Sequence, residues 1–323
     1  MSFGDIKGQD RAVTFLKNAA SSGRVSHAYI FLGPSGVGKK LAALNFAKAL
    51  NCLSEARMRP CDECASCRKA DNGNHPDIML LKPEKGAASF KIEKIRELIN
   101  QTALKAYEGR RKVYIIDEAS SLTREAISAL LKTLEEPASD STLIMLFEDL
   151  RYVPRTILSR SQVIRFFPMR FGEIRDYLVK ERKLDAAKAE LMARVSGGRI
   201  GDALGFDDES ILSKREKLLA AMARQDIFSV DFDEMSKEEL RVSLDTMLSW
   251  YGDLLAAKVS AGGEAFLFNA DRKDVIRKVS AEMDADAISR AIEDIIKAGS
   301  YIDDNANAKL VMGVLGLRIF SAT

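Results

Sequence analysis

Several residue types are scarce in this chain of 323 residues, and each scarcity argues against a class of function. Histidine occurs only twice, as His27 and His75, and neither has a partner at a spacing that indicates a catalytic pair or a metal site. No apolar run approaches the roughly 18 residues that a membrane-spanning helix needs. The formal net charge is only +2, so no general field attracts nucleic acid or an anionic membrane, and any DNA contact must be local.

Cysteine is also scarce, and its four copies all lie between positions 52 and 67. The segment Met1–Asp5 has no basic region followed by an apolar one, so no signal peptide is predicted and we expect a cytoplasmic protein. Reduced thiols are the default in that compartment, and disulfides are not expected. The single tryptophan, Trp250, lies on an apolar helical face and is expected in a helical core or interface.

Short apolar segments alternate with helical patterns in the first half of the chain. The expected strands are Ala28–Leu32, Ile78–Leu81, Val113–Ile116, Thr142–Phe147 and Val163–Phe167. The expected helices between them include Lys40–Leu50, Ile92–Leu104 and Arg124–Glu135. Such alternation predicts an α/β domain with a parallel, doubly wound sheet.

The strand signal ends near Pro168, and helical patterns follow at Glu173–Glu181 and Ala186–Val195. The polar segment Phe206–Glu209 is interpreted as a linker, and from Ile211 onward the pattern is helical almost to the end. We therefore predict an α/β domain, a small helical domain and a larger helical domain, at residues 1–168, 169–208 and 209–323.

A glycine-rich loop follows the first expected strand and opens the first expected helix. It consists of Gly33, Pro34, Ser35, Gly36, Val37, Gly38, Lys39 and Lys40. This is the context that the Walker A motif requires: the glycines let backbone N–H groups face one phosphate, the helix N-terminus adds positive charge, and Lys39 reaches the terminal phosphates. The sequence therefore predicts an ATP site at this loop.

One residue of the loop departs from the motif. The position after Lys39 is normally Ser or Thr, whose hydroxyl binds Mg²⁺, whereas the ammonium of Lys40 has no lone pair for a metal. Weak nucleotide binding, nucleotide binding without Mg²⁺ and a glycine-rich turn that binds no ligand are therefore open alternatives to an ordinary ATP site.

An acidic pair ends the expected strand Val113–Ile116. In a Walker B site the residue at Asp117 holds Mg²⁺ and the one at Glu118 polarises the attacking water. An ordinary strand end is the alternative. Because the pair follows a phosphate loop in an α/β pattern, we interpret Asp117 and Glu118 as the metal and base candidates.

The cysteines form one cluster within an insert at about residues 51–68. Cys52, Cys61, Cys64 and Cys67 are separated by eight, two and two residues. Short spacings let thiolates converge on one tetrahedral ion, and four sulfurs suit a structural zinc site with no open catalytic position. An iron–sulfur cluster and unrelated free thiols are the alternatives.

The order and spacing of these motifs resemble the bacterial DNA polymerase III clamp-loader subunits of the delta-prime and tau/gamma types. Further segments resemble that family at Phe3–Gln9, Ser26–Phe31, His75–Asp77, Leu130–Pro137 and Ile157–Ser161. The resemblance implies an AAA+ P-loop NTPase module with a parallel sheet, a small helical lid and an all-α C-terminal collar domain.

The resemblance also implies partners. These are the tau/gamma and delta subunits in a hetero-pentameric ring, and the sliding clamp and primed DNA through that complex, with no membrane involved. No segment indicates a polymerase site, so polymerase activity would belong to the DNA polymerase III complex as a whole and not to this chain.

Three departures from the family pattern favour the delta-prime type, in which the chain's own ATPase is weak or absent. They are Lys40 in the loop, Phe147–Glu148 at the sensor position after the fourth strand, and Gly201 where the lid arginine is expected. Arg199 is the nearest arginine to that last position, two residues early. The resemblance implies that Arg160 of the Ser-Arg motif acts as a trans arginine finger in a neighbour's ATP site, with Glu118 a vestigial base.

Other functions stay open on the sequence alone. The intact Asp117–Glu118 pair favours an ATP-hydrolysing motor of the tau/gamma type. Arg160 is alternatively a surface or salt-bridged arginine. A zinc-bearing, nucleic-acid-binding NTPase outside replication is a third possibility, which the segment Leu130–Pro137 argues against.

Overall fold

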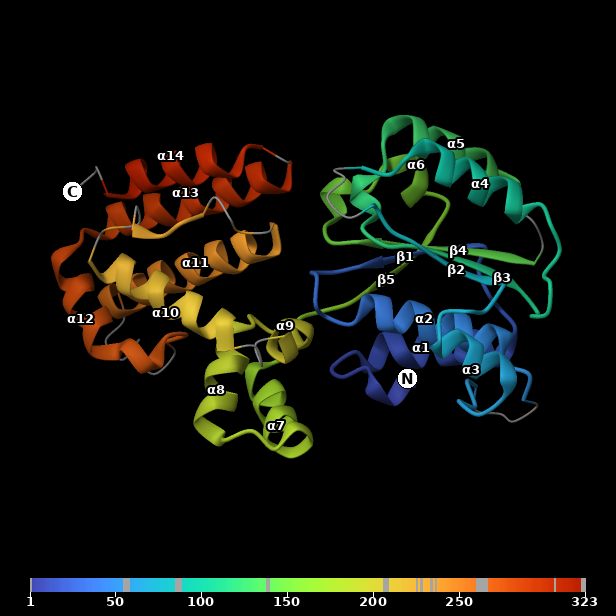
Figure 1. Ribbon diagram of the computed structural model, residues 1–323, viewed down its shortest axis with the longest axis horizontal. Helices are drawn as coiled ribbons and strands as arrows, with labels where there is room; N and C mark the ends of the chain where they lie inside the picture. Colours follow the sequence, from blue (N-terminus) through green and yellow to red (C-terminus); the bar gives the residue numbers. More distant parts are fainter. Residues whose placement is uncertain are drawn as a thin grey trace. The chain divides into compact units, whose positions relative to one another are not determined.

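The structure is a computed structural model (Figure 1), and it describes residues 2–54, 59–84, 89–137, 140–205, 209–224, 226, 229–232, 235, 237–259, 267–304 and 306–320. By its internal contacts the chain divides into two compact units. One comprises Met1–Glu173 and Gly198–Gly201, and the other comprises Ile174–Gly197 and Asp202–Thr323. Of the expected linker Phe206–Glu209, residues 206–208 lie outside the described residues and Glu209 is the first residue of a helix; the three-domain division stays a prediction.

The first unit is built on a five-stranded sheet. Its strands are β1 (Ala28–Leu32), β2 (Ile78–Leu81), β3 (Lys112–Ile116), β4 (Ser141–Phe147) and β5 (Gln162–Arg165). All neighbours pair in parallel, in the order β2-β3-β4-β1-β5. The carboxyl ends of all five strands therefore share one edge, where the segments after β1 and β3 emerge on either side of β4. The predicted parallel α/β sheet is confirmed.

Helices cover both faces of this sheet (Figure 1). The helices on one face are α1 (Asp10–Ser22), α2 (Lys39–Asn51) and α3 (Ala65–Asp71), and on the other α4 (Ile92–Thr102), α5 (Arg124–Glu135) and α6 (Arg155–Leu158). Alternation along β1 sends Tyr29 and Phe31 into the core under α1 and α2. The alternate residues, among them Ile30, enter the core under α4 and α5.

Most predicted strand limits agree with the structure to within a residue, but the last strand is shorter than predicted. It ends at Arg165, whereas an apolar run to Phe167 was expected. The Phe166 N–H still donates to the Leu32 carbonyl. The backbone of Phe167 is instead held by the Gln9 side chain, through Gln9 Nε2 to the Phe167 carbonyl (2.6 Å) and Phe167 N–H to Gln9 Oε1 (3.1 Å). The side-chain amide of Gln9 thus makes the hydrogen bonds that a neighbouring strand would make with the backbone of Phe167.

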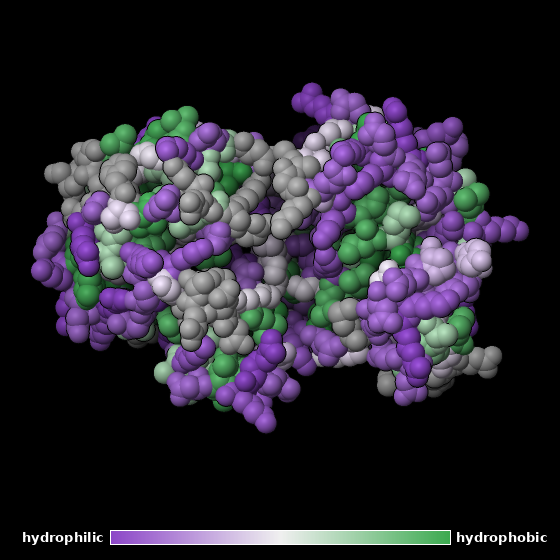
Figure 2. Space-filling view, viewed as in Figure 1, coloured by the Kyte–Doolittle hydropathy of each residue, from purple (hydrophilic) through white to green (hydrophobic). Residues whose placement is uncertain are grey.

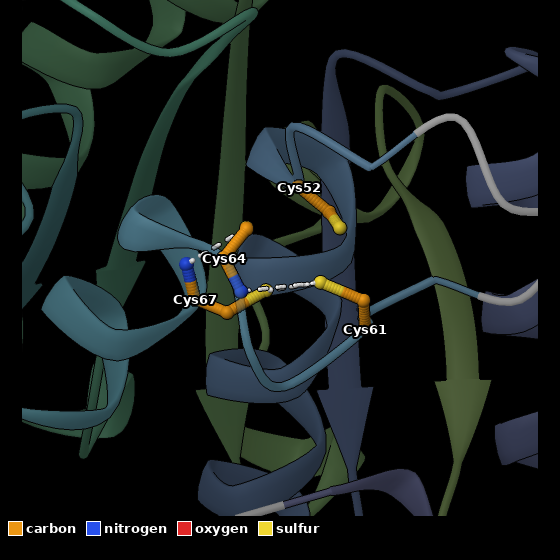
Figure 3. A group of neighbouring side chains, drawn as sticks. All are labelled: Cys52, Cys61, Cys64 and Cys67. Carbon is orange, nitrogen blue, oxygen red and sulfur yellow. Dashed lines mark hydrogen bonds between the residues drawn. The ribbon is translucent and has the colours of Figure 1, made fainter.

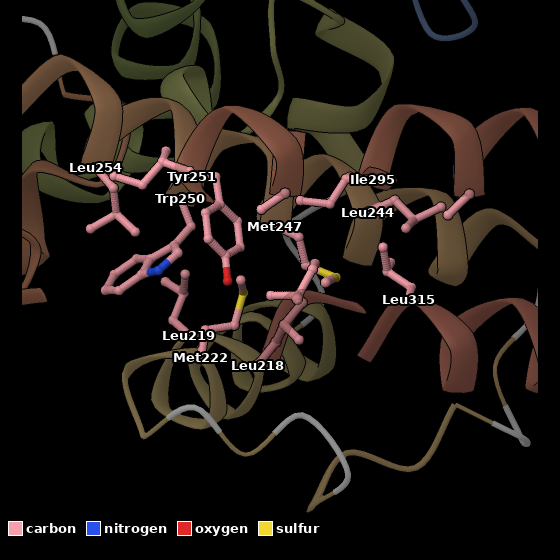
Figure 4. Close-up of a cluster of buried hydrophobic side chains, with 14 of the residues drawn as sticks. Leu218, Leu219, Met222, Leu244, Met247, Trp250, Tyr251, Leu254, Ile295 and Leu315 are labelled. Carbon is pink, nitrogen blue, oxygen red and sulfur yellow. The ribbon is translucent and has the colours of Figure 1, made fainter. Parts of the chain in front are cut away.

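The remainder of the described chain is helical. Its helices are α7 (Phe171–Arg182), α8 (Ala186–Val195), α9 (Ile200–Gly205), α10 (Glu209–Ala223), α11 (Lys237–Val259), α12 (Lys273–Glu282), α13 (Ala285–Asp303) and α14 (Ala308–Phe320). Trp250 is 1% exposed in the core that α10, α11, α13 and α14 share (Figure 4), which confirms its predicted burial. Within the described ranges, no helix is long and apolar enough to span a bilayer. Hydrophilic residues dominate the face shown in Figure 2, and apolar residues appear there only in patches.

Candidate nucleotide site and metal centre

The glycine-rich loop leaves β1 and enters α2 with the backbone conformation that its glycines permit. Gly38, the N-cap of α2, has φ 97°, a value that L side chains rarely adopt. Gly33 lies so close to the strand-end backbone that an added Cβ would be 2.2 Å from the Phe166 carbonyl oxygen. Within the described part of the chain, the backbone N–H groups from Ser35 to Leu41 donate to no protein acceptor. Such a run at a helix N-terminus suits an anion such as phosphate.

Lys39 is folded back onto this loop. Its side chain is buried, and Nζ donates to the carbonyls of Gly33 (2.5 Å) and Pro34 (2.6 Å). Burial lowers the pKa of Lys39 to about 8, although Glu148 and Asp117 act in the opposite direction. Glu148 belongs to the segment Phe147–Glu148, where the family resemblance places a sensor residue, so a carboxylate acts on Lys39 from that segment.

The structure brings Lys40 and Asp117 together from opposite sides of β4. Lys40 Nζ lies 3.1 Å from Asp117 Oδ2. Asp117 is fixed at the end of β3, because its N–H donates to the Leu81 carbonyl and its Oδ1 accepts from the Glu118 N–H (3.2 Å). Mg²⁺ requires oxygen ligands in near-octahedral geometry. An ammonium already bound to the metal-ligand carboxylate does not fit that requirement, so the residues present do not form an ordinary Mg²⁺ site.

Gly201 lies directly against the phosphate loop. Its N–H donates to the Gly36 carbonyl (2.8 Å), and an added Cβ would be 2.9 Å from that carbonyl oxygen. This is the position where the family resemblance places a lid arginine. A side chain there would collide with the loop backbone, so the contact of Gly201 with Gly36 leaves no space for an arginine at this position.

The four cysteines converge, as predicted (Figure 3). Their sulfur atoms all lie within 4.8 Å of one another, and Cys61 Sγ is 3.9 Å from Cys67 Sγ. A tetrahedral ion with bonds of about 2.3 Å requires sulfur–sulfur distances of about 3.8 Å. The backbone N–H groups of Cys64 and Cys67 donate to the sulfurs of Cys61 and Cys64, both at 3.4 Å. The cluster therefore has the ligand set and spacing for a metal ion such as zinc.

Three of these thiols differ in how readily they ionise. Burial alone would raise the pKa of Cys64, but hydrogen bonds, the largest from the Cys67 N–H, bring it down to about 6. Burial raises the pKa of Cys52 and of Cys67. Adjacent thiolates repel one another, so all four ionise together only when a cation lies between them.

Residues that sequence reasoning did not single out fix this insert to the sheet. Lys48 is buried in α2 and pairs with Asp62 (2.6 Å) and Asp71 (2.8 Å), on either side of the last two cysteines. Ser66 donates to the Asn51 carbonyl (2.7 Å) and lies 3.0 Å from His75 Nε2.

The tautomer of His75 follows from its other ring nitrogen. The Asp77 N–H donates to His75 Nδ1 (3.1 Å), so Nδ1 carries no proton and Nε2–H donates to Ser66. Burial lowers the pKa of His75, which keeps it neutral. The relay from His75 through Ser66 to Asn51 ties both ends of the insert to the start of β2. In the sequence, the His75–Asp77 segment was the only indication of this relay. No spacing rule predicts the role of Ser66, which precedes Cys67.

Arg160 lies at the opposite edge of the sheet from the phosphate loop. It precedes β5, whose first residue Gln162 aligns with Tyr29 near the amino end of β1, while the loop follows the carboxyl end. Arg160 Nη2 lies 2.8 Å from Glu135 Oε1, and Nη1 donates to the Thr156 carbonyl (3.0 Å) and Ser159 Oγ (3.2 Å). This position separates Arg160 from its own chain's phosphate loop, and its side chain is 36% exposed.

Comparisons with known proteins identify the family. The family model described as DNA polymerase III, delta subunit, matches residues 8–170. The DNA polymerase III subunit delta-prime of Bacillus subtilis (strain 168) is 30% identical over 324 residues, covering 96% of each chain. The subunit tau of Escherichia coli (strain K12) is 35% identical over 217 residues, which is 66% of this chain and 33% of tau.

Among solved structures, a gamma subunit-related protein of DNA polymerase III from Thermotoga maritima covers 94% of this chain and 98% of its own, at 17% identity and a TM-score of 0.43. The parallel sheet with its glycine-rich loop and the helical C-terminal half agree with the fold that the family resemblance implied. On the family match and on a relative aligned along nearly its whole length, the chain belongs to the DNA polymerase III clamp-loader subunits, and it is of the delta-prime type.

Proposed function

We propose that this chain is a non-motor subunit of a clamp loader, which hydrolyses ATP weakly or not at all and supplies Arg160 to the ATP site of a neighbouring subunit. The observation that carries this proposal is the Lys40–Asp117 ion pair at 3.1 Å. Hydrolysis in P-loop enzymes depends on a metal that bridges the phosphates. Here the carboxylate that would hold that metal is engaged by an ammonium of the same chain.

The lid supports the same conclusion. Gly201 packs its backbone on Gly36 with no space for a side chain, so no cation from this position reaches a terminal phosphate. Loss of transition-state positioning costs about tenfold in rate per 1.4 kcal/mol. The loss of both the metal site and the lid arginine favours a chain that assembles into the ring but does not hydrolyse ATP itself.

Arg160 has the properties that a trans finger needs. A guanidinium is permanently charged and forks onto phosphate oxygens, so it stabilises charge that develops on a transferring phosphoryl group. It lies in the short segment between α6 and β5, remote from its own loop, and contacts with Glu135 and the Thr156 carbonyl restrict its position. The proposed partners are tau/gamma and delta subunits in a five-membered ring, acting on a sliding clamp and primed DNA in the cytoplasm.

We propose zinc as the occupant of the cysteine cluster, with a structural role. The closeness of the four sulfurs supports a closed site without an open coordination position. An iron–sulfur cluster uses the same ligand type, and metal content with an absorption spectrum distinguishes the two.

A tau/gamma-like motor is the second candidate, because Asp117 and Glu118 are both present after β3. This function requires the purified chain to turn over ATP at the rate of an AAA+ motor. The proposed function requires negligible turnover by the chain alone.

The experiment is Arg160→Ala in the reconstituted clamp loader. The matched control is Arg155→Ala, since Arg155 is an exposed arginine of the adjacent α6. We expect normal assembly for both variants, and reduced DNA-stimulated ATPase and clamp loading for Arg160→Ala alone. Trans arginine fingers contribute roughly 10³–10⁵-fold at a single site, and the loss of one among several sites should lower total turnover several-fold.

Two results would overturn the finger. Unchanged ATPase and loading with intact assembly would make Arg160 a surface arginine. Failed assembly of Arg160→Ala, with normal assembly of Arg155→Ala, would make Arg160 a structural residue of the interface.

A further inference from the structure

We infer that the ammonium of Lys40 takes the place of the divalent cation, so that the loop binds a nucleoside diphosphate or triphosphate without Mg²⁺. This inference rests on the proposed function, because it assumes a loop that has lost hydrolysis. It concerns a different property, the metal dependence of binding. The misfit between Mg²⁺ and the residues present is its starting point.

The position of Lys40 matches what a substituted cation requires. Its Nζ is 3.1 Å from Asp117 Oδ2, and the two side chains are 44% and 19% exposed. A partly exposed ammonium with three donors still has hydrogen-bonding capacity beyond one carboxylate. In an ordinary site the metal links the carboxylate after β3 to the phosphate oxygens in the loop. Lys40 belongs to the phosphate loop and its ammonium contacts that same carboxylate. Its charge therefore lies between the loop and Asp117, as the charge of a metal would.

The phosphate-receiving part of the loop is intact. The N–H groups from Ser35 to Leu41 have no acceptor within the described residues, and they open a helix of 13 residues whose N-terminus is positive. Lys39 Nζ is held by two carbonyl oxygens, which a phosphate oxygen can replace at no loss of charge pairing. The backbone N–H groups of the loop and the two lysines thus supply contacts for the phosphate groups of a nucleotide, which ordinarily binds together with Mg²⁺.

The fixed cation also has a cost for chemistry. A monovalent ammonium tethered to Asp117 can donate hydrogen bonds to phosphate oxygens, but it does not coordinate and polarise them as a metal does. Binding and hydrolysis are therefore separated in this site. The bound nucleotide would act as a structural ligand of the loop, which is the opposite of a site where Mg²⁺ controls both.

The test measures the affinity of the purified full-length chain for a fluorescent ADP analogue and for ATP, with and without Mg²⁺. Metal is removed by passing the buffer over a chelating resin, because a free chelator would also attack the cysteine site. We expect affinities that agree within about twofold in the two buffers. A divalent metal adds charge-assisted contacts of the size that change affinity about tenfold or more.

Two variants sharpen the measurement. Lys40→Thr restores the hydroxyl and frees Asp117, and we expect Mg²⁺ to strengthen its nucleotide binding by at least about tenfold. Lys40→Met, the matched control, removes the charge at similar length without adding a metal ligand, and should bind more weakly than the parent chain in both buffers. Circular dichroism spectra of each variant confirm that the fold is retained.

The inference is overturned if Mg²⁺ strengthens binding to the parent chain about tenfold, or if the folded chain binds nucleotide in neither buffer. Neither result affects the Arg160 experiment in the assembled complex. Conversely, nucleotide binding that does not depend on Mg²⁺, together with unchanged ATPase and clamp loading for Arg160→Ala, would sustain this inference and reject the role of Arg160 as a trans arginine finger.

Discussion

The carboxyl and amino ends of the strands in the central sheet, called here the carboxyl edge and the amino edge, hold their charged residues by different contacts. At the carboxyl edge, Lys39 is held by loop carbonyls and Lys40 by Asp117, so both cations are engaged by the chain itself. At the amino edge, Arg160 is anchored at Glu135 yet remains 36% exposed. Lys40 is itself 44% exposed, so the two ends of the sheet differ in their anchors and not in exposure: Asp117 is the candidate metal ligand of the chain's own loop, whereas Glu135 belongs to no candidate phosphate site. A motif identified by spacing therefore says where a phosphate site lies, while single contacts decide which subunit it serves.

Both ends of the sheet depend on a stable first unit. The largest effect on stability is therefore expected from a change that removes the metal site. Helix α2 begins at the phosphate loop and is C-capped by Cys52. Cys64→Ser should abolish metal binding and lower the free energy of unfolding by more than about 3 kcal/mol, since structural metal contributes directly to folding. Metal analysis and urea unfolding measure both effects.

The control for that variant is Ala65→Ser, which adds a hydroxyl at an exposed neighbouring position and should change neither quantity. The parent chain should contain one zinc per molecule. Less than about half an equivalent, with four freely titratable thiols, would remove the metal site from the account.

The carboxyl edge should show a pH dependence that the amino edge lacks. Burial lowers the pKa of Lys39 to about 8. Lys39 therefore loses its charge as the pH rises from 7 to 9, and we expect nucleotide affinity to fall by up to about tenfold. The unfolded chain keeps this proton to a higher pH, so the contribution of Lys39 to stability rises from about pH 8 to its unfolded pKa while affinity falls.

Affinity titrations at several pH values measure this effect. Lys39→Arg stays charged throughout and should give a flatter profile, whatever its absolute affinity. An equally steep profile for that variant would assign the titration to another group.

The smallest effect is expected at the anchor of Arg160. Glu135→Gln weakens an ion pair that is largely exposed, and such pairs contribute little. We expect DNA-stimulated ATPase of the complex to fall less than about threefold. Glu136→Gln, an exposed glutamate one residue further on, is the control and should have no effect. A loss as large as that of Arg160→Ala would mean that Glu135 itself contacts the neighbour.

Local pattern accounts for much of the fold. Strand Ala28–Leu32 and helix Arg124–Glu135 were predicted to the residue, because apolar runs between turn residues and amphipathic periodicity are properties of contiguous sequence. The end of β5 was missed, because Gln9, from the other end of the domain in sequence, takes over the backbone of Phe167.

The candidate sites divide in the same way. The cysteine spacing was sufficient to predict the cluster, since four ligands within one short insert have few other ways to fold. The ion pair between Lys40 and Asp117 could not be predicted, because it depends on β1 and β3 flanking β4 in the sheet order. The contact of Gly201 with Gly36 and the relay from His75 to Asn51 likewise join segments that only the tertiary structure brings together.

The central claim is that this chain contributes to catalysis from its amino edge and not from its carboxyl edge. The most direct measurement compares Arg160→Ala with Glu118→Gln in the same reconstituted complex, by DNA-stimulated ATPase. We expect Arg160→Ala to lower turnover at least about threefold and Glu118→Gln to leave it within about twofold of the parent complex, because only the first residue would face a working ATP site. A large loss from Glu118→Gln with none from Arg160→Ala would contradict the account and identify the chain as a motor.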